Sequence, residues 1–217
     1  MFDSKIEVLY HDHMGSDKTV VDAARISLDQ DDQTFDLSKR DEKLIKYLAK
    51  NKHLSCFEHC TLTAVIICPL FTRSHIHRHR TFSYNEISRR YTSENLSFWI
   101  PEEWLRQADS NRQSSSEPLH HDVSEQCDKV YTEGVEAALQ AYEHLLDLGV
   151  SREQARAVLP QGLYTRFYMT GNLRNWAAFV NLRHDPDNAQ AQDVQLSQGA
   201  IGLLSKYFPI SMKVLMA

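Results

Sequence analysis

One apolar run, residues 61–68 (TLTAVIIC), constrains the fold of this chain more than any other segment. The run is rich in β-branched residues and almost continuously apolar, which is typical of a buried strand. Pro69 follows it directly, and the fixed φ and missing N–H of proline suit the first turn of a helix. We therefore expect a buried strand near the middle of the fold, followed by a helix in which His75 and His79 lie one turn apart.

Most of the remaining chain shows helical rather than alternating periodicity. A candidate capping box, Ser151 with Gln154, begins a helix that Pro160 interrupts, and Gly171-Asn172 marks a further break. The sequence thus predicts an α+β, helix-rich chain. The other expected elements are strands at 5–10 and 97–101, loops at 29–41 and 106–118, and helices at 19–27, 42–51, 121–148 (ending at Gly149), 173–183 and 188–207.

Length and composition exclude several classes of protein. A chain of 217 residues can bury a hydrophobic core as one domain, and its net charge of -5 argues against a general nucleic-acid binder. The first residues, MFDSKIEV, lack a signal-peptide pattern, and no apolar run has the length of a membrane span. We expect a cytoplasmic protein without a membrane partner, whose four cysteines are reduced and packed.

A dense basic cluster indicates the chemistry. Arg78-His79-Arg80 is followed, after seven residues, by Ser88 and then by Arg89-Arg90. Arginine keeps its charge at physiological pH and presents a planar fork of donors, which suits phosphate or a polarised carbonyl. The cluster predicts a phosphorylated ligand held by side chains, because the chain has neither a P-loop nor a dinucleotide-binding glycine motif. The alternative is a solvated basic surface.

Two other chemistries fit parts of the same segment. His75, His77 and His79 alternate, so on a strand they would share one face and could bind a metal ion. The neighbouring arginines oppose a bound cation, and a helix after Pro69 would separate the three rings. Ser88 could act as a nucleophile, but the G-x-S-x-G motif is absent and no acid is placed to orient a histidine base.

The segment RHRTFSYNEISRRY resembles the signature of the flavin-dependent thymidylate synthases. Further similar pieces follow in the family's order: ARIS at 24–27, HLSCFEH at 53–59, NRQSSSE at 111–117, EQARAVLP at 153–160 and LYTRFYMTGNLRNWAAFVNLR at 163–183. The resemblance implies a single catalytic domain, residues 1–217, with a small, central, mostly antiparallel sheet. It also implies a homotetramer with active sites at subunit interfaces, FAD as cofactor, and no cysteine nucleophile or bound metal.

The implied reaction is the reductive methylation of dUMP to dTMP, with methylenetetrahydrofolate as carbon donor and NADPH as reductant through FAD. The resemblance places these residues at FAD: His53, Ser55, Glu58, Arg78, His79, Arg80, Thr81, Glu86, Asn172, Leu173, Arg174 and Ala178. It places these at dUMP: His75, Ile76, His77, Arg78, Glu86, Ile87, Ser88, Arg89, Arg90 and Arg156.

By the same resemblance, Arg183 is the catalytic residue and polarises the uracil, while Asn172 and Arg174 reach the flavin of a neighbouring subunit. One preorganised donor of this kind is worth about 3 to 4 kcal/mol. Arg183 could instead only cap the carboxyl end of a helix. The sequence departs from the family pattern at His75, Arg89 and Ala178.

Two alternative functions remain open at this stage. The first is a metal-dependent hydrolase that uses His75, His77 and His79. The second is a nucleotide-binding homologue without catalytic activity.

Overall fold

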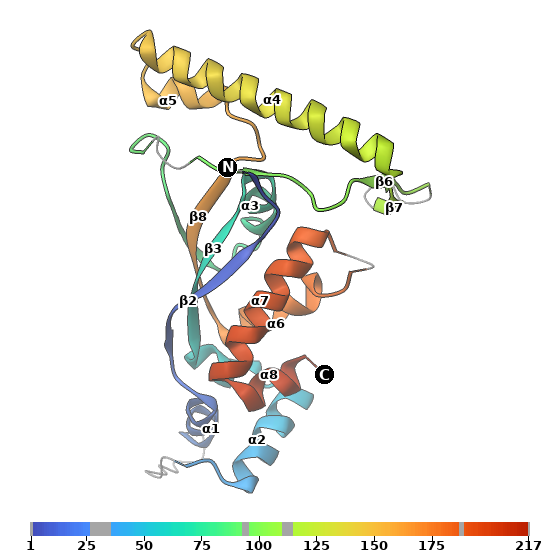
Figure 1. The fold of residues 1–217 in the computed structure, drawn as a ribbon. Coiled ribbons are helices and arrows are strands. Elements are labelled where there is room, and N and C mark those ends of the chain that lie inside the picture. Colours follow the sequence, from blue (N-terminus) through green and yellow to red (C-terminus); the bar gives the residue numbers. More distant parts are fainter. Residues whose placement is uncertain (1, 27–35, 93–95, 110–114, 187–188, 217) are drawn as a thin grey trace. The chain divides into compact units, whose positions relative to one another are not determined.

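The computed structural model describes residues 2–26, 36–92, 96–109, 115–186 and 189–216. The chain divides into two compact units. Unit 1 comprises Met1–Lys5, Cys68–His75 and Glu86–Thr165, and unit 2 comprises Ile6–Ile67, Ile76–Asn85 and Arg166–Ala217. Figure 1 shows the ribbon of the chain with its helices and strands labelled.

A four-stranded sheet in the order β2-β3-β8-β4 lies mainly in unit 2. Its central strand β3 (Thr61–Pro69) is buried along most of its length, which confirms the strand predicted from the apolar run. β2 (Glu7–Met14) runs antiparallel to it, in a register from Glu7 opposite Ile67 to Met14 opposite Thr61. The other strands are β8 (Tyr164–Asn172) and β4 (Ser83–Glu86).

Strand β8 is absent from the sequence prediction, in which Gly171-Asn172 was a break in helical structure. Its side chains alternate between exposed Arg166 and Tyr168 and buried Phe167 and Met169, the period-2 pattern of a strand. Gly171 is required by a close approach, because a Cβ there would lie 2.5 Å from ring atoms of Phe82. The glycine therefore lets the segment after Arg80 lie against this strand.

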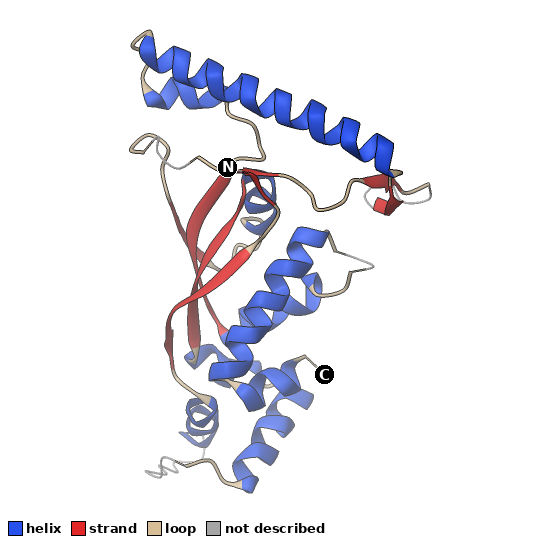
Figure 2. Ribbon diagram, viewed as in Figure 1, coloured by secondary structure: helices blue, strands red, loops and turns tan. Residues whose placement is uncertain are grey.

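In the described part of unit 2, six helical segments accompany the sheet, and Figure 2 colours the helices blue. Helix α6 follows β8 without a loop and packs against α7, and its buried face includes Leu173, Trp176 and Val180. The buried Trp176 indole donates a hydrogen bond to the Leu62 carbonyl at 3.1 Å, which ties α6 to β3. The segments are α1 (Asp17–Arg25), α2 (Lys39–Lys50), the 3₁₀ segment η2 (Leu54–His59), α6 (Leu173–Arg183), α7 (Ala191–Tyr207) and α8 (Pro209–Leu215).

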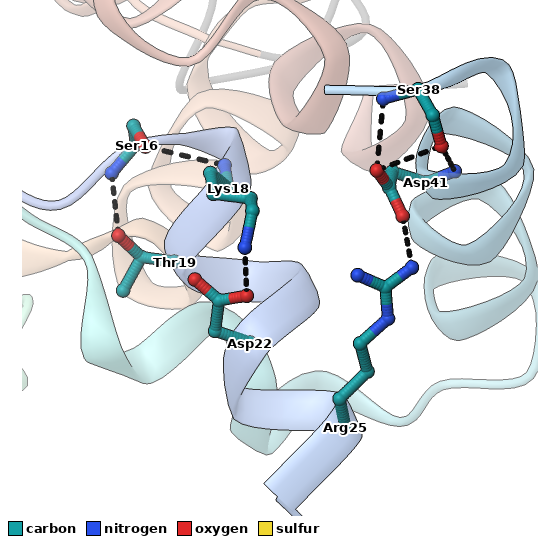
Figure 3. Close-up of polar contacts among 7 residues, drawn as sticks. All are labelled: Ser16, Lys18, Thr19, Asp22, Arg25, Ser38 and Asp41. Carbon is teal, nitrogen blue, oxygen red and sulfur yellow. Dashed lines mark hydrogen bonds and ion pairs between the residues drawn. The ribbon is translucent and has the colours of Figure 1, made fainter. Parts of the chain in front are cut away.

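Capping boxes fix the starts of α1 and α2 (Figure 3). Ser16 and Thr19 cap α1, and Ser38 and Asp41 cap α2 in the same way. The Asp41 carboxylate accepts from the Ser38 amide at 2.8 Å and from its hydroxyl at 2.9 Å, and it also pairs with Arg25. Because Asp41 is only 2% exposed, this network joins the carboxyl end of α1 to the start of α2 inside the unit.

Unit 1 packs around a separate apolar cluster that includes Phe98, Val135, Tyr142 and Leu163. The long helix α4 ends at Asp147, and Gly149 follows with a positive φ of 86°, as the sequence predicts for a glycine stop. The described elements of unit 1 are β1 (Phe2–Asp3) paired with β5 (Phe98–Trp99), α3 (Leu70–Ile76), β6 (Leu105–Gln107) paired with β7 (Ser115–Pro118), α4 (His121–Asp147), α5 (Arg152–Ala155) and the 3₁₀ segment η3 (Arg156–Val158).

Several predicted boundaries need correction. Helix α3 ends at Ile76, so His75 and His79 are not one helical turn apart. Ser151 makes no side-chain cap, although its carbonyl accepts from the Gln154 amide at 3.0 Å and α5 begins at the next residue. The predicted loop at 106–118 forms paired strands at both ends, because short polar segments can satisfy their backbone groups as a hairpin.

The other expected helices and strands are present, with small shifts at their ends. Helix α2 begins at Lys39 because Ser38 and Asp41 cap it, so the predicted loop at 29–41 and the predicted start at Glu42 are both displaced. Ser27 of the predicted helix 19–27, residues 29–35 and 110–114 of the predicted loops, and Asn188 of the last predicted helix lie outside the described residues. The α+β fold class is confirmed, and the single-domain assignment stays a prediction. Among the described helices, none is both long and apolar enough for a membrane span.

The two carboxylates drawn in Figure 3 provide a matched test of stability. Asp41→Asn should lower the free energy of unfolding by about 2 kcal/mol, because it weakens a buried, charge-assisted network. Asp22→Asn should change it by less than about 0.5 kcal/mol, because the Asp22 side chain is 47% exposed and its one ion pair among the described residues is with Lys18. Urea unfolding followed by circular dichroism measures both, and equal losses would contradict this assignment.

Candidate active site

The Arg78-His79-Arg80 segment forms a turn between α3 and β4, and Tyr84 fixes its backbone. The Tyr84 hydroxyl lies 3.0 Å from the Ile76 carbonyl oxygen and 2.9 Å from that of His79. A hydroxyl has one hydrogen to donate, so the two carbonyls share it and are held together. Burial raises the pKa of Tyr84 well above its usual range, which keeps this donor protonated.

His79 contacts Arg183, the residue predicted to be catalytic. Arg183 Nε donates to His79 Nε2 at 3.2 Å, and the His79 ring packs edge-on against Phe179 with centroids 4.9 Å apart. Because His79 accepts through Nε2, the hydrogen-bonding pattern assigns the ring proton to Nδ1. The structure thus joins the basic motif to the last residue of α6.

Arg78 and Arg80 are both exposed, and neither makes a hydrogen bond or ion pair within the described part of the chain. A guanidinium without a protein partner beside a fixed turn is available to an anionic ligand. His77 instead packs against Tyr84 and Phe167, with centroids 4.2 and 5.1 Å away. Since His75 lies in α3 while His77 and His79 follow it, the strand geometry required for a shared metal face is not present.

A second group of predicted residues lies around η2 and the start of α6. Glu58 and Arg174 are exposed and pair with each other at 2.5 Å. The Asn172 side chain caps α6 by accepting a hydrogen bond from the backbone N–H of Asn175 at 3.0 Å. The side-chain amide of Asn175 donates to the Thr81 carbonyl at 3.0 Å. These contacts link the start of α6 both to η2 and to the basic turn.

The remaining predicted residues of this group differ in exposure. Ala178 is exposed one helical turn after Arg174, so both lie on the same open face of α6, whereas Leu173 is buried. His53 and Ser55 are exposed, and the His53 ring stacks on Tyr47 with centroids 6.1 Å apart.

In unit 1, Glu86 is held by two donors that the sequence prediction did not include. Arg73 Nε donates to Glu86 Oε1 at 3.1 Å, and the Thr165 hydroxyl donates to the same oxygen at 2.6 Å. Glu86 and Arg73 are each partly exposed, with side chains 24% and 29% accessible.

The segment after Glu86 presents a hydroxyl and a guanidinium together. Arg90 contacts the Ser88 hydroxyl through Nε at 3.4 Å, and Ile87 is 40% exposed. Arg89 is half-buried and donates to the Tyr164 carbonyl at 3.2 Å, and burial lowers its pKa from the usual value. Arg156 is exposed and bonds the Glu153 carbonyl, so the described contacts do not bring it to the other predicted residues.

Four residues that contact the predicted site residues were not themselves predicted from the sequence: Tyr84, Arg73, Thr165 and Asp193. Tyr84 lies inside the basic motif, so its position was a usable signal. Thr165 lies on the strand that was not predicted. Arg73 reaches Glu86, and Asp193 reaches Arg183, only through packing within their own units. Asp193 is 0% exposed and forms an ion pair with Arg183 at 3.7 Å.

These features are typical of α+β proteins in which exposed arginine side chains, and not a glycine-rich loop, are available to bind phosphate groups. The family model described as thymidylate synthase complementing protein matches residues 9–210. A flavin-dependent thymidylate synthase of Kosmotoga olearia is 37% identical over 198 residues, which cover 91% of this chain and 84% of that protein. One of Thermus thermophilus is 36% identical over 200 residues, covering 92% and 72%.

A solved structure shows the same fold. The UMP/dUMP methylase PolB from Streptomyces cacaoi, bound with 5-Br dUMP, superposes with a TM-score of 0.88 at 32% identity, covering 98% of this chain and 95% of that one. The same methylase bound with 5-Br UMP also gives a TM-score of 0.88. The chain belongs to the flavin-dependent thymidylate synthase family, whose name implies a flavin cofactor such as the FAD that the sequence predicts.

The residues present fit such a cofactor. FAD carries a pyrophosphate, and Arg78 and Arg80 supply exposed cations that no described protein group neutralises. None of the four cysteines lies in the basic motif, and none forms a disulfide bond among the described residues.

Tyr84→Phe removes the hydroxyl that holds the basic turn. We expect FAD affinity to fall about fivefold, because a single hydrogen bond is worth about 1 kcal/mol. Tyr168→Phe is the control, since the partly exposed Tyr168 ring stacks on His11 and its hydroxyl has no hydrogen-bond partner among the described residues. Fluorescence titration with FAD measures both affinities, and unchanged FAD binding by Tyr84→Phe would contradict this role.

The cysteines should differ in reactivity. Burial is the main cause that raises the pKa of Cys60 to about 11, so about one thiol in a thousand is ionised at pH 8. Iodoacetamide at pH 8 should therefore label the half-buried Cys56 and Cys127 in the folded protein and leave Cys60 unmodified. Peptide mass spectrometry measures the labelling, with urea-unfolded protein as the control, and rapid labelling of folded Cys60 would disprove its protection.

Proposed function

We propose that this protein catalyses the reductive methylation of dUMP to dTMP as a flavin-dependent thymidylate synthase. The observation that supports it best is the contact between His79 and Arg183. The family resemblance assigns His79 to the flavin and Arg183 to the uracil, so this hydrogen bond would join the two ligand sites.

The chemistry requires a carbon donor and a reductant. Methylenetetrahydrofolate supplies one carbon at the oxidation level of formaldehyde, and two electrons from NADPH convert that carbon to a methyl group. The products are dTMP, tetrahydrofolate and NADP⁺. FAD, when bound, supplies hydride transfer between the reductant and the transferred carbon.

The protein's own groups bind, orient and stabilise charge. Arg78 and Arg80 would hold the anionic part of FAD, and Ser88 with Arg90 would hold the phosphate of dUMP. Arg183 would stabilise negative charge that develops on the pyrimidine, because a fixed guanidinium beside a carbonyl acts without reorganisation. Ser88 would thus bind the substrate and not attack it.

We propose a homotetramer whose active sites lie at subunit interfaces, in the cytoplasm. Arg174 and Ala178 share an exposed face of α6, which leaves both accessible to a neighbouring subunit. In that assembly Asn172 and Arg174 would reach the flavin of the neighbour. Arg174 would then exchange its exposed pair with Glu58 for a ligand contact.

A second candidate substrate comes from the solved relative. PolB is described as a UMP/dUMP methylase and was solved with both 5-Br dUMP and 5-Br UMP. The same reaction on UMP would differ only in the ribose 2′-hydroxyl. Parallel assays with dUMP and UMP distinguish the two specificities.

The first experiment is the absorption spectrum of the purified protein with FAD under anaerobic conditions. The flavin bands should bleach with NADPH and shift with dUMP, and dTMP should form once methylenetetrahydrofolate is added. A homologue without catalytic activity would bind dUMP without consuming NADPH. A hydrolase that uses the three histidines would lose activity to a chelator and would bind no flavin.

Arg183→Ala should separate catalysis from cofactor binding. We expect turnover to fall at least about a hundredfold, as for the loss of one preorganised donor, while FAD retention changes little. Stopped-flow measurement of product formation and the flavin-to-protein absorbance ratio report the two quantities. Equal loss of both would contradict the catalytic role of Arg183.

A further inference from the structure

Arg183 is held at three points, all within unit 2. Its Nε donates to His79 at 3.2 Å, its Nη1 lies 3.7 Å from Asp193 Oδ2, and its carbonyl accepts from the Ser197 hydroxyl at 3.2 Å. Within the described residues, Nη2 has no protein acceptor. The edge of the guanidinium that carries Nη2 is therefore the one that a ligand can reach.

Asp193 is an unusual partner for a residue at a helix end. Arg183 is the last residue of α6 and Asp193 lies in the first turn of α7, so the two helix dipoles favour both charges. That effect would operate equally well at the surface. Asp193 is nevertheless fully buried, and the Arg183 side chain is only 17% exposed.

Burying an ion pair is costly, and the pair stabilises the fold less than apolar residues of the same volume commonly would. Its 3.7 Å separation is also longer than a hydrogen bond. The pair is therefore better explained by orientation than by stability. The buried Asp193 carboxylate contacts one side of the Arg183 guanidinium, and the His79 ring accepts from its Nε. Together these two contacts fix the plane of the guanidinium.

We infer that Asp193 is a positioning residue that orients Arg183 toward the pyrimidine of the substrate. This inference rests on the proposed function, because it gives Arg183 the uracil as its ligand. Asp193 itself is too deeply buried to touch a ligand. Its effect on the reaction must pass through Arg183.

The test is a double-mutant cycle with Asp193→Asn and Arg183→Ala in the FAD-loaded protein. Asp193→Asn alone should lower kcat about tenfold and weaken dUMP binding, since misplacing a charge-stabilising group is costly. FAD retention and KM for NADPH should not change. In the Arg183→Ala background, Asp193→Asn should have no further effect on kcat or on the dUMP affinity measured from the flavin absorbance shift.

Asp17→Asn is the matched control. Asp17 is also buried in unit 2, at 3% exposed, and it accepts from the Ile210 and Ser211 amides at 2.9 Å at the start of α8. Its replacement should lower the melting temperature without changing kcat. A merely structural Asp193 would behave in the same way.

The outcomes are distinct. If Asp193→Asn reduces kcat equally with and without Arg183, or changes only the melting temperature, the positioning role is wrong. If Arg183→Ala itself changes neither turnover nor dUMP affinity, the proposed role of Arg183 has failed first. Should Asp193→Asn not fold, Asp193→Glu keeps the charge but moves the carboxylate by one methylene, and the same cycle decides.

Discussion

The attachment of α6 to the central strand is the constraint on which the candidate site depends. The Trp176 indole is fully buried and donates to the Leu62 carbonyl, so the helix cannot rotate without burying an unpaired donor. The same eleven-residue helix carries Arg174 and Ala178 on its open face and Arg183 at its end. The hydrogen bond from Trp176 to Leu62 therefore fixes the orientation of a helix whose residues are predicted to contact both FAD and dUMP.

Around this helix, neutral hydrogen bonds fix the backbone and charged groups remain for ligands. Tyr84 and Asn175 use their polar groups on the carbonyls of the basic turn, whereas Arg78 and Arg80 stay free of partners in the described residues. Arg183 differs from these two arginines, because Asp193 and His79 restrict it. This difference fits a site in which some cations bind an anion and one must act with a defined orientation.

Sequence reasoning found the parts of this protein that have a local cause. The apolar run predicts β3, the glycine stop predicts the end of α4, and helical periodicity places α6. It missed β8 because Gly171-Asn172 indicates a break, while the alternation of Arg166 to Met169 was too short to outweigh it. The order β2-β3-β8-β4 depends on pairing between distant segments, which no local pattern shows.

The residues of the candidate site also fall into those that a local motif predicts and those that only tertiary packing brings together. A specific motif predicted the site arginines, the family and the cofactor, and the family is confirmed, but the partners of those residues come from tertiary packing. Arg73 and Thr165 reach Glu86 from a helix and a strand, and Asp193 reaches Arg183 from a different helix. Residues that work through another side chain have no ligand-binding pattern of their own, so only the structure reveals them.

The close approach of Phe82 to Gly171 has a consequence for how mutational data on this protein would be interpreted. A methyl group at position 171 would collide with the ring and displace the segment between Arg80 and Tyr84. In a functional screen, Gly171→Ala would then resemble the loss of a ligand contact, although glycine has no side chain to bind anything. Loss of function in variants at position 171 would therefore report a steric clash with Phe82 and not the loss of a binding or catalytic group.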